Sequence, residues 1–462
     1  MRQRRAQSAD RKHAEPQLDA AHTPASQLVM IEKPIYGGAF LARLEGKAIF
    51  VPLSLPGEEV RVRTVENRRG YAAAEVEEIV AASPERIAPA CRHFGICGGC
   101  HYQHAGYGSQ LAFKKAILRE TLERGGVRAP EDISQLSAAS ESQSWAYRNR
   151  IRLAFDAAGN IGYRGRRSHA VIPIVECPIA APLLLKAAQT FADVIRQVLP
   201  SLQPTEIALF CGAGETSLLA TIFKTSSAIA PVAKESFTEI ARAAAEQIPA
   251  LKGVELVVEG RAGNRIPAQF PSATTQWGES FLTYRAAGFD YRVDHGAFFQ
   301  VNRWLVDGLV DEVTGGKQGA LAWDLFAGVG LFARRLTATF ARVVAVESAP
   351  SAATALKENL RGTTGSAVRA STLDFLRRAN KNERPDLIVV DPPRTGLDPE
   401  VIALLAGVGA LELTYVSCDP ATLARDLRVL LSSGYEIQSL TLADLFPHTF
   451  HLETVAHLRR SC

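Results

Sequence analysis

The cysteine at position 418 lies in a sequence context that favours reactivity. In the stretch TYVSCDPATLARDL, a β-prone apolar run ends at Cys418, Asp419 and Pro420 form a turn, and the following residues have helical spacing. A thiol at the carboxyl end of a strand, just before a helix N-terminus, lies where open sheets bind ligands and where thiolates are stabilised. A strand cysteine is usually a small buried hydrophobe, but this position indicates a reactive thiol. Asp419 beside it is expected to oppose ionisation.

Three more cysteines form a pattern typical of a metal centre. Cys91, Cys97 and Cys100 lie in CRHFGICGGC, where the intervening glycines let the backbone fold around a metal. Cys177, in VECPI, is the best candidate for a fourth ligand. Four thiolates can hold zinc or an iron–sulfur cluster, and the spacing alone does not decide between them. Buried thiols without a metal are the alternative.

A glycine-rich turn in WDLFAGVGLFARRL predicts a cofactor site. A strand ends near Asp324, and a tight turn through Gly328 and Gly330 opens a helix, so a small cofactor can approach the backbone closely. The third glycine of the dinucleotide fingerprint is missing. The next strand ends in Glu347, where a carboxylate can accept hydrogen bonds from ribose hydroxyls. These features indicate a nucleoside cofactor, and the later motifs favour S-adenosylmethionine over NAD.

The stretch LIVVDPPRTGL brings an acidic residue to the same sheet edge. An apolar strand ends at Asp391, and Pro392 and Pro393 fix a rigid extended turn. Such a turn can form a wall beside a planar base, with Arg394 available for a phosphate. An aspartate at a strand end is often only a helix cap, but the two prolines argue against an immediate helix.

A carboxylate near the C-terminus is a candidate general base. Glu453 lies in FPHTFHLETVAHL, among apolar residues with a strand-like pattern. Desolvation there raises a carboxyl pKa and suits the group to proton abstraction. The alternative is an edge-strand residue that faces water. His451 is predicted to be structural.

The elements that must position these residues fall into three predicted domains, as a chain of 462 residues leads us to expect. Short runs punctuated by glycines predict an OB-like β-barrel over 27–82, with basic and aromatic residues that suit nucleic acid; a solvated strand face is the alternative. The cysteine-rich part, 83–290, is predicted to be an α+β domain. Alternating strands and helices over 291–462 predict a doubly wound α/β sheet with ligands at the strand ends. Residues 1–26 are predicted to be a disordered basic tail or a solubilising extension.

The composition is that of a soluble globular protein. The chain is 47% hydrophobic and 22% charged, with a net charge of +4 that does not by itself demand a nucleic-acid partner. No apolar run predicts a membrane span, and the basic N-terminus has no apolar segment typical of a secretory signal. Seven cysteines, an odd number, argue against a disulfide framework. We therefore expect a cytoplasmic protein.

Together, these motifs resemble those of the RNA 5-methyluridine methyltransferase family, specifically the iron–sulfur members that methylate 23S ribosomal RNA, from about Gln27 onwards. The resemblance implies a TRAM domain, a class I S-adenosylmethionine-dependent methyltransferase domain, Cys418 as the nucleophile at uracil C6 and Glu453 as the base. It assigns a [4Fe-4S] cluster to four cysteines, namely Cys91, Cys97, Cys100 and Cys177. It also implies cofactor contacts, beside the turn glycines, by Gln300 of FFQVN, Phe326, Leu331, Glu347, Asp374 and Asp391.

The chain departs from that family pattern at two positions. Asp419 stands where the family often has asparagine, and Leu331 stands where a polar residue is common, so Leu331 can offer only its backbone. The resemblance favours ribosomal RNA over transfer RNA as the substrate, a flipped-out target uridine and a monomer. Three alternatives are a tRNA uracil-C5 methyltransferase, an exocyclic-amino methyltransferase that needs no cysteine, and a redox-responsive RNA-binding protein.

Overall fold

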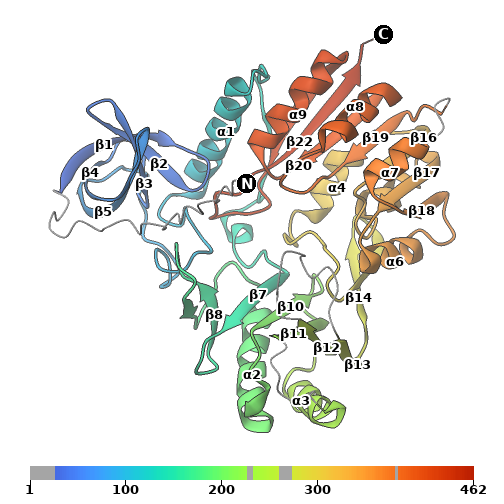
Figure 1. The fold of residues 1–462 in the computed structure, drawn as a ribbon, viewed down its shortest axis with the longest axis horizontal. Helices are drawn as coiled ribbons and strands as arrows, with labels where there is room; N and C mark the ends of the chain where they lie inside the picture. The colour runs from blue at the N-terminus through green and yellow to red at the C-terminus, as the bar shows by residue number, and fades with distance from the viewer. Residues whose placement is uncertain (1–25, 226–232, 260–272, 380–382, 462) are drawn as a thin grey trace, which may run out of the picture.

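The computed structural model describes residues 26–225, 233–259, 273–379 and 383–461 (Figure 1). The predicted tail therefore lies outside the described residues, except for its last position. Among the described residues, no helix combines the length and the apolar character needed to cross a bilayer.

The N-terminal strands form a closed barrel, drawn in blue in Figure 1. Its strands are β1 (Gln27–Pro34), β2 (Ala39–Leu44), β3 (Lys47–Pro52), β4 (Glu59–Asn67) and β5 (Tyr71–Ala81). They are arranged in the order β1-β2-β3-β5-β4 around a core that includes the fully buried Phe40 and Val51. The turn between β1 and β2 contains Gly37 and Gly38 with φ of 102° and 83°, a backbone conformation that favours glycine. The predicted barrel is thus confirmed.

The central part of the chain contains a seven-stranded sheet in the order β13-β12-β11-β10-β7-β8-β9. Two helices pack against it, and in α2 the buried Leu184, Ala188 and Phe191 recur at helical spacing. The predicted α+β fold is present here. The elements are β7 (Arg150–Phe155), β8 (Ile161–Arg164), β9 (Val171–Pro173), α2 (Pro182–Val198), β10 (Glu206–Cys211), β11 (Leu218–Thr225), α3 (Lys234–Gln247), β12 (Leu251–Glu259) and β13 (Ala273–Gly278), with short 3-10 helices at Glu141–Ser144 and Pro200–Leu202.

The C-terminal part is built on an eight-stranded sheet with helices on both faces. The sheet order is β18-β17-β16-β19-β20-β22-β21-β6, in which the first five strands run parallel to one another and β22 is antiparallel to β20 and β21. The elements are α4 (Val306–Thr314), β16 (Gly319–Leu325), α5 (Leu331–Leu336), β17 (Phe340–Glu347), α6 (Pro350–Asn359), β18 (Gly365–Arg369), α7 (Thr372–Arg378), β19 (Leu387–Val390), α8 (Pro399–Val408), β20 (Glu412–Ser417), α9 (Pro420–Ser432), β21 (Tyr435–Ala443), β22 (Glu453–Arg460) and the edge strand β6 (Ser134–Leu136).

The strands alternate their buried side chains between the two faces. In β16, Trp323 packs with the core that contains α8 and α9, whereas Ala322 packs with the core that contains α4 to α6. The predicted doubly wound sheet is therefore confirmed. A separate hairpin, β14 (Phe281–Ala286) and β15 (Phe289–Asp294), packs against α6.

Part of the predicted central region belongs to the C-terminal sheet. Strand β6 pairs in parallel with β21, and α1 (Tyr107–Arg124) packs against α9. The contact is close, because a Cβ added at Gly125 would lie 2.5 Å from Cβ of Ala424. A strand of three residues carries too little periodicity to be recognised from sequence.

Candidate functional site

The sheet topology brings the two candidate catalytic side chains together. Parallel strands β16, β17, β19 and β20 end at one edge of the sheet, and antiparallel β22 begins at that same edge. Ser417 pairs with Thr454 in this antiparallel pair. Cys418, which follows Ser417, and Glu453, which precedes Thr454, therefore lie next to each other at the adjoining ends of β20 and β22. The reversal of strand order on either side of β16 is where ligands bind in open α/β sheets.

The thiol of Cys418 is half-buried at the end of β20, between the strand and α9. Burial, together with the negative charges of Glu453 and Asp391, raises its pKa to about 12, and Arg394 opposes this rise. The thiol is therefore protonated at neutral pH, and its ionisation must be coupled to a change in the charges around it.

Asp419 has a different role from the one expected. Its carboxylate caps α9 and accepts hydrogen bonds from the backbone N–H groups of Ala421 at 3.0 Å and Thr422 at 2.9 Å. The charges that act most strongly on the thiol are those of Glu453, Asp391 and Arg394. Asp419 thus stabilises the N-terminus of α9, next to the thiol.

Glu453 is only 5% exposed, so the alternative of an edge residue that faces water is wrong. Burial raises its pKa well above the ordinary range, and Asp391 adds to this effect while Arg394 opposes it. Burial also raises the pKa of Asp391 to about 7. These carboxyl groups bind protons more tightly than exposed ones, which suits them to proton transfer near neutral pH.

The barrel reaches the same sheet edge through its β1–β2 turn. The hydroxyl of Tyr36 donates to the carbonyl oxygen of Cys418 at 3.4 Å, and the Tyr36 ring lies edge-on to Phe450 at 5.5 Å. His451 follows Phe450, and its Nδ1 lies 3.3 Å from Nη2 of Arg394. Sequence reasoning missed Tyr36, because nothing local links it to a residue so far along the chain.

The glycine turn after β16 is shaped for close approach of a ligand. Phe326 has φ of 66°, an uncommon value for a residue with a side chain and a sign of functional strain. Gly328 has φ of 55°, and a Cβ added there would meet nothing within 4 Å, whereas one at Gly330 would lie 2.6 Å from Leu356. The backbone N–H of Gly328 donates to Glu347 at 2.9 Å, which fixes the predicted carboxylate over the turn.

Asp324 is a buried acid beside this turn that sequence reasoning used only as a strand end. It is 0% exposed, and one carboxylate oxygen accepts from the N–H of Ala333 at 2.8 Å. The other oxygen has no partner among the described residues. Burial raises its pKa to about 7, with further contributions from Asp391 and Glu347. An unpartnered acceptor among carboxylates fits a cationic ligand, such as a sulfonium or an ammonium group.

The remaining predicted cofactor residues have other neighbours. Gln300 is 7% exposed, and its backbone carbonyl accepts from Asn149 at 2.9 Å. The side chain of Leu331 is buried in the core, so it can offer only its backbone, as expected. Asp374 is exposed in the first turn of α7, where Ser371 donates to its carboxylate at 2.8 Å, a helix-capping contact.

The four predicted ligand cysteines surround a single cavity. Cys91, Cys97, Cys100 and Cys177 all line it, together with the half-buried Arg148. Within the described ranges, however, no group of three or more His, Cys, Asp or Glu side chains is arranged to hold a metal ion. The sequence thus correctly predicts that these thiols gather, but the structure does not present a finished site for a single ion.

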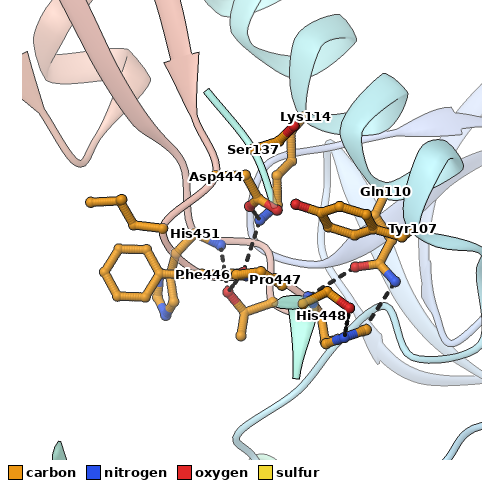
Figure 2. A network of polar contacts seen from close by, with 12 residues as sticks. Tyr107, Gln110, Lys114, Ser137, Asp444, Phe446, Pro447, His448 and His451 are labelled. Carbon is orange, nitrogen blue, oxygen red and sulfur yellow. Dashed lines mark hydrogen bonds and ion pairs between the residues drawn. The ribbon is translucent and has the colours of Figure 1, made fainter. Parts of the chain in front are cut away.

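The loop before Glu453 is fixed by a buried polar network (Figure 2). Lys114 of α1 and Asp444 have 0% exposed side chains, and Nζ of Lys114 lies 2.5 Å from the carboxylate and 2.9 Å from the carbonyl oxygen of Phe446. Gln110 accepts from the N–H of His448 at 2.9 Å, and its Nε2 lies 3.1 Å from the ring Nδ1 of His448. Side chains of α1 therefore hold residues 444–448 in place, just before the candidate base Glu453 in the sequence.

Comparisons with known proteins follow the same division of the chain. A family model described as tRNA (Uracil-5-)-methyltransferase matches residues 275–461, and a TRAM domain model matches residues 25–76. The first match covers the strands that carry the candidate thiol and base, and the second covers most of the barrel.

Relatives and a solved structure match almost the whole chain. An uncharacterized RNA methyltransferase of Thermotoga maritima is 31% identical over 93% of this chain and 98% of its own. The 23S rRNA (uracil(1939)-C(5))-methyltransferase RlmD of Halomonas elongata is 32% identical over 92% of this chain and 88% of its own. The crystal structure of the Pyrococcus abyssi tRNA (uracil-54, C5)-methyltransferase, in complex with S-adenosyl-L-homocysteine, is similar with a TM-score of 0.73 and 25% identity over 94% of this chain and 100% of that one.

Proposed function

Because the chain belongs to the RNA (uracil-5-)-methyltransferase family, we propose that Cys418 and Glu453 carry out its reaction and that ribosomal RNA is its substrate. The activity itself is S-adenosylmethionine-dependent methylation of uracil C5 in RNA. The expected TRAM domain and C-terminal methyltransferase fold are confirmed. The observation that carries the residue assignment is the juxtaposition of the thiol and the buried carboxyl group across β20 and β22.

The first step is attack by the thiol. C5 of uracil is a poor nucleophile, so Sγ of Cys418 adds to C6 and generates an enolate at C5. The thiol proton must leave as this bond forms, because the thiol is protonated in the free protein. Asp391, with a pKa of about 7, is matched to accept that proton at neutral pH. Arg394 stabilises the negative charge that develops on sulfur.

The second step is transfer to C5 and release. When bound, S-adenosylmethionine supplies the methyl group and a positive sulfonium charge. The glycine turn, Glu347 and the unpartnered oxygen of Asp324 would hold it. Glu453 then removes the proton from C5, the C6–S bond breaks with its electron pair on sulfur, and the Cys418 thiolate recovers its proton from Asp391 as the uracil ring is restored. The step requires Glu453 in its carboxylate form, which Arg394 favours, and burial makes that carboxylate a stronger base.

We also propose that the four cysteines hold a [4Fe-4S] cluster. Their convergence on one cavity that Arg148 also lines supports this, because a thiolate-ligated cluster is anionic and needs a compensating charge. A cluster of four irons also separates its thiolates more widely than a single ion does. The cluster would cross-link the segment from Cys91 to Cys100 to Cys177 in the central region.

The cluster proposal has a direct test. Protein purified without oxygen should absorb visible light with iron and sulfide in equal amounts, and each Cys→Ala variant at the four positions should lose that absorption. A colourless protein that takes up zinc stoichiometrically, even after reconstitution with iron and sulfide, would contradict the proposal.

Ribosomal RNA is the proposed substrate because rRNA methyltransferases match nearly the full length at 32% identity. The target base must leave its stack for Cys418 to reach C6. We propose that the chain acts as a monomer in the cytoplasm, where reduced thiols persist. Labelled methyl transfer to ribosomal RNA and to transfer RNA, followed by mapping of 5-methyluridine, tests the substrate, and preferential labelling of transfer RNA would contradict it.

The residue assignment is tested with 5-fluorouridine RNA. Because fluorine cannot be abstracted as a proton, the wild-type protein should form a covalent complex that survives denaturing electrophoresis. Cys418→Ala should form none and transfer no methyl group, while S-adenosylmethionine still binds. Retained methyl transfer would instead favour the alternative of exocyclic-amino methylation, which needs no thiol.

A further inference from the structure

We propose that the cavity between the barrel and the Gly165–Arg167 turn binds a backbone phosphate of the RNA substrate, through Arg166 and Arg167. This inference rests on the proposed function, because it identifies a substrate contact outside the reacting centre. The cavity has a volume of about 460 Å³ and lies apart from the thiol and the glycine turn. Three arginines line it: Arg164 at the end of β8, and Arg166 and Arg167 in the turn that follows.

The cavity is built from three separate parts of the chain. Gly37 of the β1–β2 turn lines it from the barrel, and Gly98 lines it from the cysteine segment. Backbone hydrogen bonds hold the arginine turn against that segment: the N–H of Gly98 donates to the carbonyl of Arg164 at 3.1 Å, and the N–H of Arg166 donates to Ile96 at 2.9 Å. These hydrogen bonds fix the backbone that carries the arginines against the cysteine segment.

The positive charge of this cavity is only partly compensated among the described residues, by Glu206 beside Arg164 and by Glu75, whose charge acts on Arg166. Arg164 has a partner in Glu206 at 3.5 Å, but Nη1 of Arg166 is buried without any hydrogen-bond partner among the described residues. Burial, and then the positive charge of Arg167, lowers the pKa of Arg166. A buried N–H donor left without an acceptor is unfavourable. An anion with several acceptor oxygens supplies what is missing, and a planar guanidinium matches phosphate in particular.

The position of the cavity indicates that the anion is part of the RNA backbone. The β1–β2 turn contacts the cavity through Gly37, while its neighbour Tyr36 reaches the carbonyl of Cys418. On the same side, His101 lines the cavity, and its ring lies 4.7 Å from that of Phe450 in the loop that leads to Glu453. These contacts connect the cavity to the surroundings of Cys418, so we infer that a strand whose uridine lies at Cys418 reaches this cavity with a flanking nucleotide.

The test is the salt dependence of RNA binding. The probe is a fluorescein-labelled oligouridylate, measured by anisotropy with Arg166→Ala, Arg167→Ala and the double variant. Each lost phosphate contact should weaken RNA binding. It should also make the increase of Kd between about 50 and 200 mM KCl smaller by about 2.6-fold, because each contact to a single strand adds about 0.7 to the slope of log Kd against log salt concentration. Arg166→Lys keeps the charge but loses the planar fork, so it should bind more weakly with an unchanged salt slope.

Controls separate this site from general charge and from misfolding. Arg242→Ala removes an exposed cation from α3, far from the barrel in Figure 1, and should leave both Kd and slope unchanged. Binding of S-adenosylmethionine reports whether each variant is folded. If Arg166→Ala no longer binds S-adenosylmethionine, the RNA affinity and salt slope of Arg167→Ala, a substitution at an exposed position, test the proposal instead. A double variant that binds RNA with wild-type Kd and slope would overturn the proposal. If the wild-type protein binds RNA in this way but does not methylate it, the phosphate site stands and the proposed catalytic function fails.

Discussion

Replacing Lys114 by methionine should destabilise the loop that leads to Glu453. Both charged groups of the Lys114–Asp444 pair are completely buried, and their separation is 2.5 Å. The substitution leaves the Asp444 carboxylate in the interior without its counter-ion. Removing one partner of such a pair typically costs about 3–5 kcal/mol, because the remaining charge is desolvated and unpaired. Methionine fills a similar volume, so the cost reflects the charge and not a cavity.

The matched control is the double variant Lys114→Met/Asp444→Leu. Replacing both members of a buried pair by apolar residues is often neutral or even stabilising. The double variant should therefore recover most of the stability that the single variant loses. The hydrogen bond from Lys114 to the carbonyl of Phe446 is lost in both variants, at a cost of about 1 kcal/mol, and so does not distinguish them.

Urea denaturation with tryptophan fluorescence provides the assay, because the Trp145 ring stacks on His448 of the same loop at 3.7 Å. The single variant should unfold locally at lower urea, with a parallel loss of methyl transfer and unchanged binding of S-adenosylmethionine. Equal losses of stability in the single and double variants would refute the reasoning, since the cost would then come from packing and not from an unpaired charge.

Three further predictions concern the reaction, the cofactor and acid. Glu453→Gln should lower turnover by about 10²–10⁴-fold and accumulate a methylated covalent complex on ordinary uridine RNA, visible by denaturing electrophoresis. Gly328→Val should weaken S-adenosylmethionine binding in calorimetry, because φ of 55° strains a side chain that would project into the open space of the turn. Burial lowers the pKa of His448 to about 3, below its unfolded value of about 6.5, so the loop should lose stability as pH falls from about 6.5 to about 3. The change can be followed by tryptophan fluorescence as a function of pH, because Trp145 stacks on His448. In the His448→Gln variant the fluorescence should depend less on pH over this range.

The sequence predicts the parts of this site that depend on local pattern. Strand ends followed by turns place Cys418, Glu347 and Asp391 at one edge, because parallel strands share the direction of their carboxyl ends. Glu453 was open to two interpretations, since burial depends on β22 lying between β20 and β21, which periodicity does not reveal. The Lys114–Asp444 pair joins positions that are 330 residues apart, and no local signal marks either partner.

The same limit explains why Asp419 was misjudged. A carboxylate next to a thiol in sequence suggests electrostatic repulsion, but side-chain direction decides the effect. Asp419 turns toward the N–H groups of α9, whereas Glu453 and Asp391 arrive from other strands and act on the sulfur. Proximity along the chain is therefore a poor guide to electrostatics at a sheet edge where several strands converge.

The acidic surroundings of Cys418 imply an order of events. A thiol with a pKa of about 12 is a weak nucleophile in the free protein; burial is the main cause of this high pKa, and the carboxylates of Glu453 and Asp391 add to it. Those same carboxylates are needed later, because they are the proposed proton acceptors of the reaction. Any positive charge brought to this edge lowers the pKa of the thiol, the effect that Arg394 already exerts in part. Keeping the sulfur protonated until cofactor and base are both present protects it from oxidation, so the high pKa is consistent with a nucleophile that becomes reactive only in the assembled complex.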